Sequence, residues 1–366
     1  MKKMCDYIVK GKEVFVGLDV AKRKYATNVR SEKMMVHQTM LPADFEIMRN
    51  YLKNNYPQCD ITVIYEAGFC GFGLHDYLTA EGIKCIVTPP TSVTIEKVDK
   101  KKCDKHDAAR LARNLENGDY KECEVPDKER REDRLISRTL EQVEKEIRRE
   151  KNRIRKFYDF NGLNGKNISE KWYVADWRAA RKMSEVEGPV GMSLRVHFSL
   201  LDELLRQRRE LRRELMKLSR KPRYANAVQL LSSISGVGVM SAIRMVLEWG
   251  EDWSRFASAS RIAAYSGMVS REFSTGDGQR RGHITGQSRA IIRATLVQCA
   301  WTAIRHDPAM MDKYRRVFRN TGSSKKAIVA VARKLVVRMR AIMLSGKPYQ
   351  VGLLEERLEK KAAKRG

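Results

Sequence analysis

Four acidic residues have a spacing that could hold a divalent metal ion: Asp19, Glu66, Asp104 and Asp107. Asp19 and Glu66 each end a short run of β-branched and aromatic residues, which predicts two buried strands. Asp104 and Asp107 are three residues apart, which places both on one face of the first turn of a helix. Carboxylate oxygens from two strands and one helix suit Mg²⁺ or Mn²⁺ better than zinc. Each residue alone could instead cap a helix or end a strand, so this interpretation depends on all four.

A pair of hydroxyl groups offers a second kind of chemistry. Ser274 and Thr275 lie on a small glycine-rich loop and are followed by Arg280, Arg281 and His283. A hydroxyl nucleophile among phosphate-binding cations could attack a phosphodiester. The same composition is also that of an ordinary turn, which is the simpler interpretation on residue chemistry alone.

A glycine turn between two apolar stretches predicts a phosphate contact. Residues 230–239 are typical of a helix, a tight turn with Gly236 and Gly238, and a second helix. In such a helix-hairpin-helix, the turn amides and the N-terminus of the second helix bind phosphate without recognising bases. Any tight turn between helices can use Gly-x-Gly, so the basic surroundings of the motif strengthen this interpretation.

The charge of the chain favours a polyanionic partner. Its 366 residues carry 72 Lys and Arg against 45 Asp and Glu, a formal net charge of +27. Residues 1–125 are nearly neutral, with 20 basic and 18 acidic side chains, so the surplus lies in the remainder. Nucleic acid is the expected partner. A membrane is not expected, because the sequence has no run of about 18 apolar residues and no N-terminal signal segment.

The cysteines indicate the compartment. There are seven, an odd number, and none forms a Cys-x-x-Cys pair. This pattern argues against zinc fingers and against a secreted disulfide framework. We therefore expect the protein to work in a reducing cytoplasm.

The elements that must position the carboxylates follow a recognisable order. The pattern predicts three consecutive strands and then alternating helices and strands, at residues 14–19, 25–30, 34–39, 43–54 (helix), 61–66, 72–80 (helix) and 83–87. This is the order of a ribonuclease H-like α/β domain, in which carboxylates gather at the ends of adjacent strands.

The rest of the chain is predicted to be helical. Residues 129–157 and 194–219 have leucines at helical spacing and dense charges, which predicts a long coiled-coil arm around a central insert, 161–190. We divide the chain into a metal-binding domain at 1–125, the arm at 126–224, a helical C-terminal domain at 225–350 and a basic tail at 351–366.

Ordered motifs along nearly the whole chain give it a family resemblance. It resembles the bridge-RNA-guided transposases of the 110-type insertion-sequence group, the DEDD recombinases related to Piv-like invertases. The matching segments are 16–22, 65–74, 102–108, 235–238, 263–267, 281–285, 330–335 and 345–349. Cys103 replaces a threonine that is frequent in the group, and the central insert is hard to align. Neither departure touches a carboxylate.

The resemblance implies the roles of these residues. It implies a RuvC-like N-terminal domain in which Asp19, Glu66, Asp104 and Asp107 bind Mg²⁺ or Mn²⁺. It also implies a C-terminal transposase domain whose serine attacks DNA phosphate and forms a covalent phosphoserine link. In related sequences that serine directly precedes a glycine, and Thr275 holds that place here. Ser274 is the nearest serine and has the less hindered hydroxyl, so we predict Ser274 as the nucleophile, with Thr275 as the alternative.

The expected function is therefore that of an insertion-sequence transposase. It would recombine donor and target DNA under the guidance of a structured RNA from the element. Two strand exchanges need more than one active site, so a homodimer or homotetramer is expected. Two other classes are a RuvC-type nuclease that hydrolyses DNA junctions and a non-catalytic nucleic-acid-binding protein.

Overall fold

The computed structural model describes residues 11–90, 104–163, 172–275, 278–284 and 288–351. Within these ranges, the side chains of Asp104, residues 271–281 and His283 lie outside the description. The chain divides into two compact units, Met1–Pro126 and Asp127–Gly366. The finer division into arm, C-terminal domain and tail stays a prediction, and the tail beyond Val351 lies outside the described residues.

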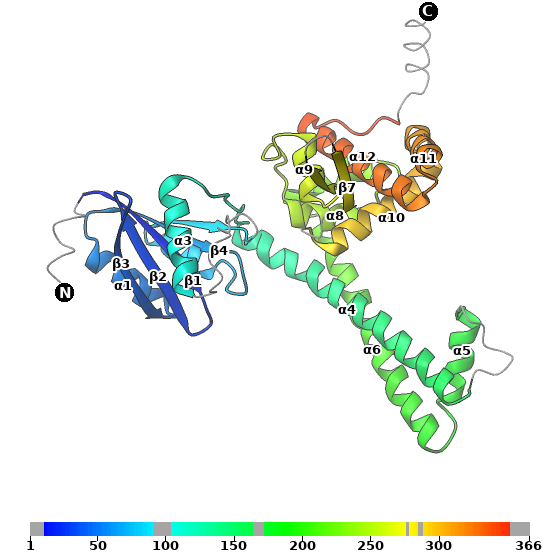
Figure 1. Cartoon of the computed structure of the whole chain (residues 1–366). Helices are drawn as coiled ribbons and strands as arrows, with labels where there is room; N and C mark the ends of the chain where they lie inside the picture. Colours follow the sequence, from blue (N-terminus) through cyan, green and yellow to red (C-terminus); the bar gives the residue numbers. More distant parts are fainter. Residues whose placement is uncertain (1–10, 91–103, 164–171, 276–277, 285–287, 352–366) are drawn as a thin grey trace, which may run out of the picture. The chain divides into compact units, whose positions relative to one another are not determined.

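A five-stranded sheet forms the centre of the first unit (Figure 1). Its strands are β1 (Glu13–Val20), β2 (Lys24–Ser31), β3 (Met34–Pro42), β4 (Asp60–Glu66) and β5 (Lys84–Thr88). The spatial order is β3-β2-β1-β4-β5, with β1 antiparallel to β2 and parallel to β4. The predicted meander followed by parallel strands is confirmed. This order is consistent with a ribonuclease H-like fold.

Helices cover both faces of the sheet, because β1 is apolar on both sides. Alternate residues Val14, Val16 and Leu18 pack in one core with the buried side chains of helices α1 (Phe45–Asn55) and α2 (Gly73–Ala80). On the other face, α3 (Asp104–Asn117) packs Leu111 and Leu115 against Ile64 and Ile86.

The second unit begins with two long helices that pack along each other (Figure 1). They are α4 (Lys128–Phe160) and α6 (Pro189–Leu218), with α5 (Val174–Met183) in the segment between them. Leu194, Phe198 and Leu201 of α6 are buried in one core with Ile147 and Ile154 of α4. The two long helices predicted for the arm are confirmed, and part of the predicted insert, residues 164–171, lies outside the described residues. Among the described helices, none is long and apolar enough to cross a membrane.

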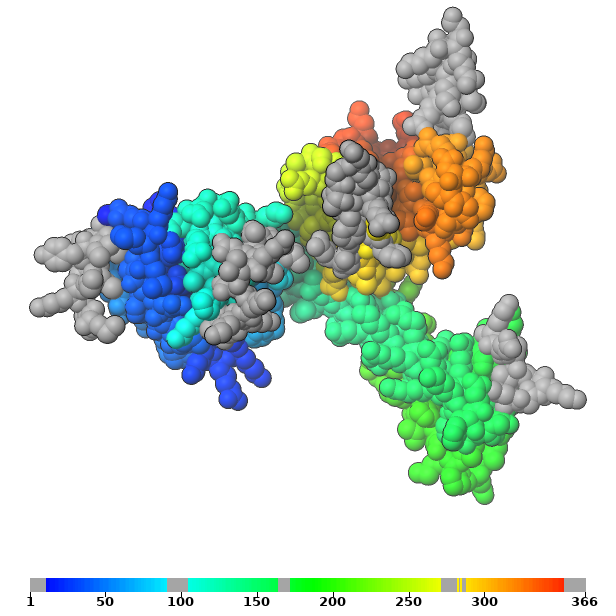
Figure 2. All heavy atoms as spheres, viewed as in Figure 1, coloured from blue at the N-terminus to red at the C-terminus, as the bar shows by residue number. Residues whose placement is uncertain are grey.

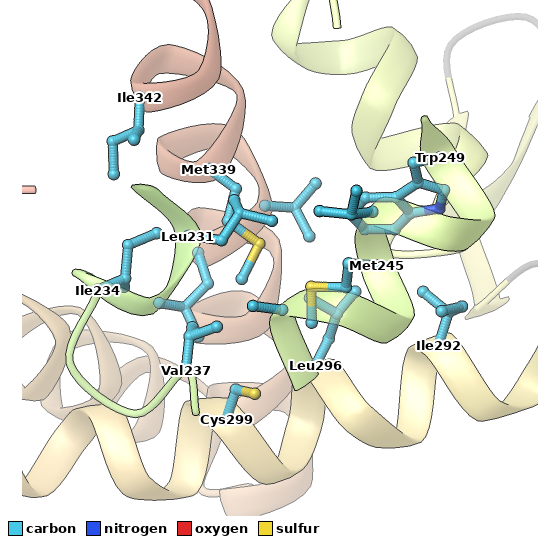
Figure 3. Close-up of a cluster of buried hydrophobic side chains, with 14 of the residues drawn as sticks. Leu231, Ile234, Val237, Met245, Trp249, Ile292, Leu296, Cys299, Met339 and Ile342 are labelled. Atoms are coloured by element: carbon cyan, nitrogen blue, oxygen red, sulfur yellow. The ribbon is translucent and has the colours of Figure 1, made fainter. Parts of the chain in front are cut away.

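The remaining helices surround one large core (Figure 3). They are α7 (Pro222–Ser232), α8 (Val239–Trp249), α9 (Ala259–Tyr265), α10 (Ala290–His306), α11 (Pro308–Thr321) and α12 (Ser324–Ser345). Val331, Leu335 and Met339 recur at helical spacing on α12 and are fully buried, which places this helix in the middle of the core. Taken over its described residues, the protein is mixed α/β and mostly helical.

The segment expected to be a glycine-rich loop around Ser274 is instead a β-hairpin. Its strands are β6 (Ser270–Thr275) and β7 (Gly278–Ile284), which run antiparallel. The loop assignment was therefore wrong for Ser274 and Thr275, both of which lie in β6. Hydrogen bonds between the two strands stabilise the extended conformation despite the turn-like composition of the segment. Local composition does not reveal this pairing.

Partly buried ion pairs join the base of α4 to the helical core. Glu248 of α8 accepts hydrogen bonds from Arg138 of α4 at 3.1 Å and from Arg289 at 2.8 Å. Arg289 also donates to Glu141 of α4 at 2.6 Å. These ion pairs therefore link α4 to α8 and to the residue before α10. Beyond this junction, α4 continues into the arm.

Candidate functional site

The carboxyl ends of β1 and β4 bring the first two predicted ligands together. These strands are parallel neighbours, and Leu18 pairs with Tyr65. The next residues along each strand are Asp19 and Glu66, which therefore lie side by side at the same edge of the sheet. Both are only partly buried, so their carboxylates can be reached from this edge.

A glycine brings the third carboxylate to the same edge. Gly17 lies so close to α3 that a Cβ there would be 2.2 Å from the carbonyl oxygen of Ala108 and 2.3 Å from the amide nitrogen of Ala112. The helix backbone thus rests directly on β1. Asp107 precedes Ala108, so this contact fixes the position of Asp107 near the end of β1.

The electrostatics of Glu66 show that the other two carboxylates lie close enough to act on it. Burial raises the pKa of Glu66 above its usual value, Arg110 lowers it, and Asp107 and Asp19 each raise it again. The net pKa shift is upward, so removing Glu66 from water and crowding it with like charges outweighs the attraction of the guanidinium.

Arg110 is the described cation closest to this group. Its Nη2 lies 2.9 Å from Oδ1 of Asp107 and 3.7 Å from Oε1 of Glu66. Its Nε is buried and has no hydrogen-bond partner within the described part of the chain. Sequence reasoning missed this residue, although its spacing three after Asp107 places it one helical turn further along α3.

The fourth predicted ligand, Asp104, is the first residue of α3, and its side chain lies outside the described part. Its backbone position is one turn before Asp107, as the spacing predicted. Among described residues, no group of three or more His, Cys, Asp or Glu is arranged to hold a metal ion as it stands. The donor set of hard carboxylate oxygens nevertheless suits Mg²⁺ or Mn²⁺, provided that Arg110 moves from Glu66 and Asp107.

The hairpin that carries the predicted nucleophile is held at its base by close packing. Gly267 has φ +70°, and a Cβ there would lie 2.0 Å from Oγ of Ser288. Gly267 precedes β6 and Ser288 precedes α10, so this contact joins the two ends of the segment that contains the hairpin. Ser274 pairs with Gln279, and Thr275 pairs with Gly278 as the last pair before the turn. The side chains of Ser274 and Thr275 lie outside the described part.

The two glycines of the helix-hairpin-helix turn have different surroundings. Gly236 has φ +92°, and a Cβ there would lie 2.6 Å from backbone atoms of Ala303 and Cys299 on α10. Gly236 is therefore required for the turn to pack on α10. Gly238 is exposed, has nothing within 4 Å of such a Cβ, and caps the N-terminus of α8. This end of the motif is open to a ligand.

Comparisons with known proteins agree on one family. Residues 228–315 match the family described as "Transposase IS116/IS110/IS902 family", and residues 16–160 match the DEDD transposase family of the IS110 type. Two similar proteins of Sinorhizobium fredii carry the names "Putative transposase y4qE" and "Putative transposase y4rJ". The first is 27% identical, covering 93% of this chain and 84% of the relative, and the second is 28% identical, covering 89% and 90%. The transposase of insertion sequence element IS1533 from Leptospira borgpetersenii is 23% identical over 65% of this chain and 70% of its own length.

Proposed function

Because the chain belongs to the IS110 family of transposases and so rearranges DNA, we propose that it does this by serine transesterification at a divalent-metal centre. The observation that carries this proposal is the meeting of Asp19, Glu66 and Asp107 at one edge of a ribonuclease H-like sheet. Three mutually repelling carboxylates would be costly to maintain in a domain that had no use for them.

Asp19, Glu66 and Asp107, together with Asp104, would hold Mg²⁺ or Mn²⁺. When bound, such an ion lowers the pKa of a coordinated hydroxyl and stabilises the charge that develops on phosphate. The protein's own contribution is to fix the carboxylates through the sheet register and through the contact between β1 and α3. Arg110 would be released from Glu66 and Asp107 and become available to a phosphate oxygen.

Ser274 of the hairpin is the proposed nucleophile, with Thr275 as the alternative. Its Oγ forms a bond to phosphorus while the bond from phosphorus to one deoxyribose oxygen breaks, and that oxygen leaves as a hydroxyl carrying the serine proton. A deoxyribose hydroxyl of another strand then attacks the phosphoserine, which restores Ser274 and forms a new phosphodiester. Because one ester replaces another at each step, joining needs no ATP.

The proposed partners are donor and target DNA and a structured RNA from the element. The formal charge of +27 supports a polyanion, and the exposed N-terminus of α8 at Gly238 supports a contact to phosphate. In this proposal base pairing with the RNA selects the DNA sites, so the protein needs to recognise backbone and shape rather than bases.

A homodimer or homotetramer is proposed because two strand exchanges need more than one nucleophile. An exposed apolar stripe on α6 supports this: Met192, Val196 and Leu200 recur every four residues and are 63%, 63% and 44% exposed. A Val196→Glu, Leu200→Glu double variant should shift the mass measured by light scattering towards the monomer. An unchanged mass would place the self-contact elsewhere.

A recombination assay tests the chemistry. Element ends, a target plasmid and Mg²⁺ are incubated with protein, and products are resolved on denaturing gels with and without protease. We expect Asp19→Asn and Ser274→Ala to abolish a protein–DNA adduct, with Thr275→Ala tested beside them. Asp60→Asn serves as the matched control, because Asp60 is exposed at the opposite end of β4 from Glu66.

The outcomes of this assay distinguish a serine recombinase from a hydrolytic nuclease and from a non-catalytic binding protein. An adduct lost in Asp19→Asn and in one hydroxyl variant supports transesterification and identifies the nucleophile. Free nicked DNA without any adduct, unchanged by both hydroxyl variants, would identify a hydrolytic nuclease of the RuvC type. Binding without strand cleavage, unchanged in Asp19→Asn, would identify a non-catalytic binding protein.

A further inference from the structure

A row of aromatic side chains lies on the surface formed by α10 and α11. The rings of Trp301 and Tyr314 have centroids 5.9 Å apart, and those of Tyr314 and Phe318 are 6.1 Å apart and nearly parallel, at 5°. Tyr314 also packs on the core, whereas Trp301 and Phe318 are 40% and 44% exposed. The row therefore ends in two aromatic rings that face solvent.

Exposed arginines follow these rings at helical spacing on α10 and α11. Helix α11 carries four basic residues and one acidic residue, Asp312. Arg315 and Arg319 lie one turn from each other, and Arg315 is one turn from Phe318. On α10, Arg305 is one turn after Trp301. We call Trp301, Tyr314, Phe318, Arg305, Arg315 and Arg319 the aromatic–basic surface. Figure 2 shows α11 (orange) at the outer edge of the helical core.

The arginines of this surface differ from those at the base of the arm. There, Arg138, Arg289 and Arg244 are paired with glutamates. By contrast, in the described part of the chain Arg305, Arg315 and Arg319 make no ion pair or hydrogen bond. They contribute nothing evident to holding the helices together, and unpaired like charges on one helix repel each other. Their charge is therefore available to an anionic partner.

We propose that the aromatic–basic surface binds an unpaired segment of nucleic acid, with bases stacking on Trp301 and Phe318 and phosphates pairing with the arginines. Exposed rings combined with cations form the stacking platform by which proteins bind single strands. A duplex presents phosphates but keeps its base faces inside, so it would satisfy the arginines and leave the rings unused. None of these residues belongs to the carboxylate group or to the hairpin.

The site rests on the proposed nucleic-acid partner but not on metal or serine chemistry. Its occupant is an unpaired stretch of either RNA or DNA, because both offer the same base faces and phosphates. An RNA loop and a displaced DNA strand are the two sources, and the 2′-hydroxyl is the difference by which they can be told apart.

The test is fluorescence anisotropy with the full chain and three labelled probes: oligo(dU) and oligo(U) of about 16 nucleotides, near the upper end of single-strand sites, and a duplex of the same length. Trp301→Ala with Phe318→Ala should weaken single-strand binding at least about 10-fold, because each stacked base contributes markedly to affinity. Duplex binding should change less than about two-fold. Phe160→Ala is the matched control, since this ring is 90% exposed at the far end of α4.

Charge variants complete the experiment. Arg315→Gln with Arg319→Gln should weaken binding of single strands and reduce the slope of log affinity against log salt by about 1.4, two phosphate contacts' worth. Preference for oligo(U) over oligo(dU) would assign the surface to RNA, and the reverse preference to DNA. Equal loss of duplex and single-strand binding in the ring variant, or no loss of either, would overturn the proposal. So would a change of oligomeric state in that variant, which would make the surface a contact between copies.

The failure of this proposal is distinguishable from failure of the chemistry. The surface is tested by the single-strand affinity of the ring variant, whereas the chemistry is tested by adduct formation in Asp19→Asn. A ring variant that binds normally while Asp19→Asn is inactive would refute the surface and leave the proposed reaction standing.

Discussion

Replacing Gly17 by alanine should displace α3 from the sheet and disperse the carboxylates. The new Cβ would lie 2.2 Å from the Ala108 carbonyl oxygen, whereas ordinary contact begins at 3.4 Å. This oxygen and the other nearest atom, the amide nitrogen of Ala112, both belong to the helix backbone, so no side chain can rotate out of the way. The helix and the strand must therefore separate by about 1 Å, which a close-packed interior accommodates poorly.

The size of the effect follows from that displacement. Overfilling a packed core costs about 1–3 kcal/mol of folding free energy, and this contact is near the upper end because backbone must move. Asp107 moves with α3 relative to Asp19 and Glu66. A misplacement of about 1 Å at a reacting centre can cost about 100-fold in rate, so recombination should fall by about that factor even in the folded fraction.

Urea denaturation and Mn²⁺ titration by calorimetry measure the two consequences separately. The matched control is Gly68→Ala, close to the same site, where the nearest atom to a new Cβ is the Glu66 carbonyl oxygen at 3.9 Å. Gly68 does not have a positive φ, so that variant should keep wild-type stability and Mn²⁺ affinity. Wild-type stability and Mn²⁺ affinity in Gly17→Ala would refute the inference that the contact between β1 and α3 positions Asp107.

Three further predictions concern charge and packing. Burial and the neighbouring carboxylates raise the pKa of Glu66 in the native state. Without metal, the free energy of unfolding should therefore fall as pH rises through that pKa, because the native state must then give up its proton. Urea midpoints measured in EDTA should show this fall for the wild type and lack it for Glu66→Gln. Arg289→Met should lower the free energy of unfolding by about 1–3 kcal/mol, as measured by chemical denaturation. Arg206→Met is the control and should have a smaller effect, because Arg206 pairs with Glu203 and Glu210 on an exposed face of α6; equal effects would contradict a structural role for the arm junction. Gly267→Ala should impair adduct formation but not Mn²⁺ affinity, since the new Cβ would meet Ser288 and Arg293 at the base of the hairpin and none of the carboxylates; a normal adduct yield would contradict that role.

The sheet and its two strand-end carboxylates were predictable because their signals are local. Short β-branched runs ending at Asp19 and Glu66 can hardly be anything other than buried strands, and three strands before the first helix predict a meander. The strand register then follows from burying both faces of β1. The three-residue spacing of Asp104 and Asp107 needs only helical geometry. The roles of these residues in catalysis stay predictions.

Features that depend on which residues pair in the folded chain could not be predicted. The strand state of Ser274 is set by pairing with Gln279, and residues of turn-like composition give little sign of it. Nothing in the sequence distinguishes Gly17 from any other glycine in a strand. Its role comes from the contact with α3, whose residues lie about ninety positions later in the chain. The sequence does not distinguish the arginines at the arm base from those of α11. Only the structure shows that Arg289 is paired, whereas Arg315 has no partner among the residues that the structure describes.

The charges at the carboxylate edge give a reason to expect a divalent ion that does not depend on family membership. The groups that act on the pKa of Glu66 are Arg110, Asp107 and Asp19. With Glu66 itself, these are three negative charges against one positive charge, and the pKa of Glu66 stays raised because burial and the two other carboxylates outweigh the single guanidinium. A divalent cation would neutralise the remaining two charges, whereas a second arginine or a monovalent ion would not. The cation would also take up the carboxylate oxygens that Arg110 now contacts, so that the guanidinium could turn to the phosphate that the reaction brings to this edge.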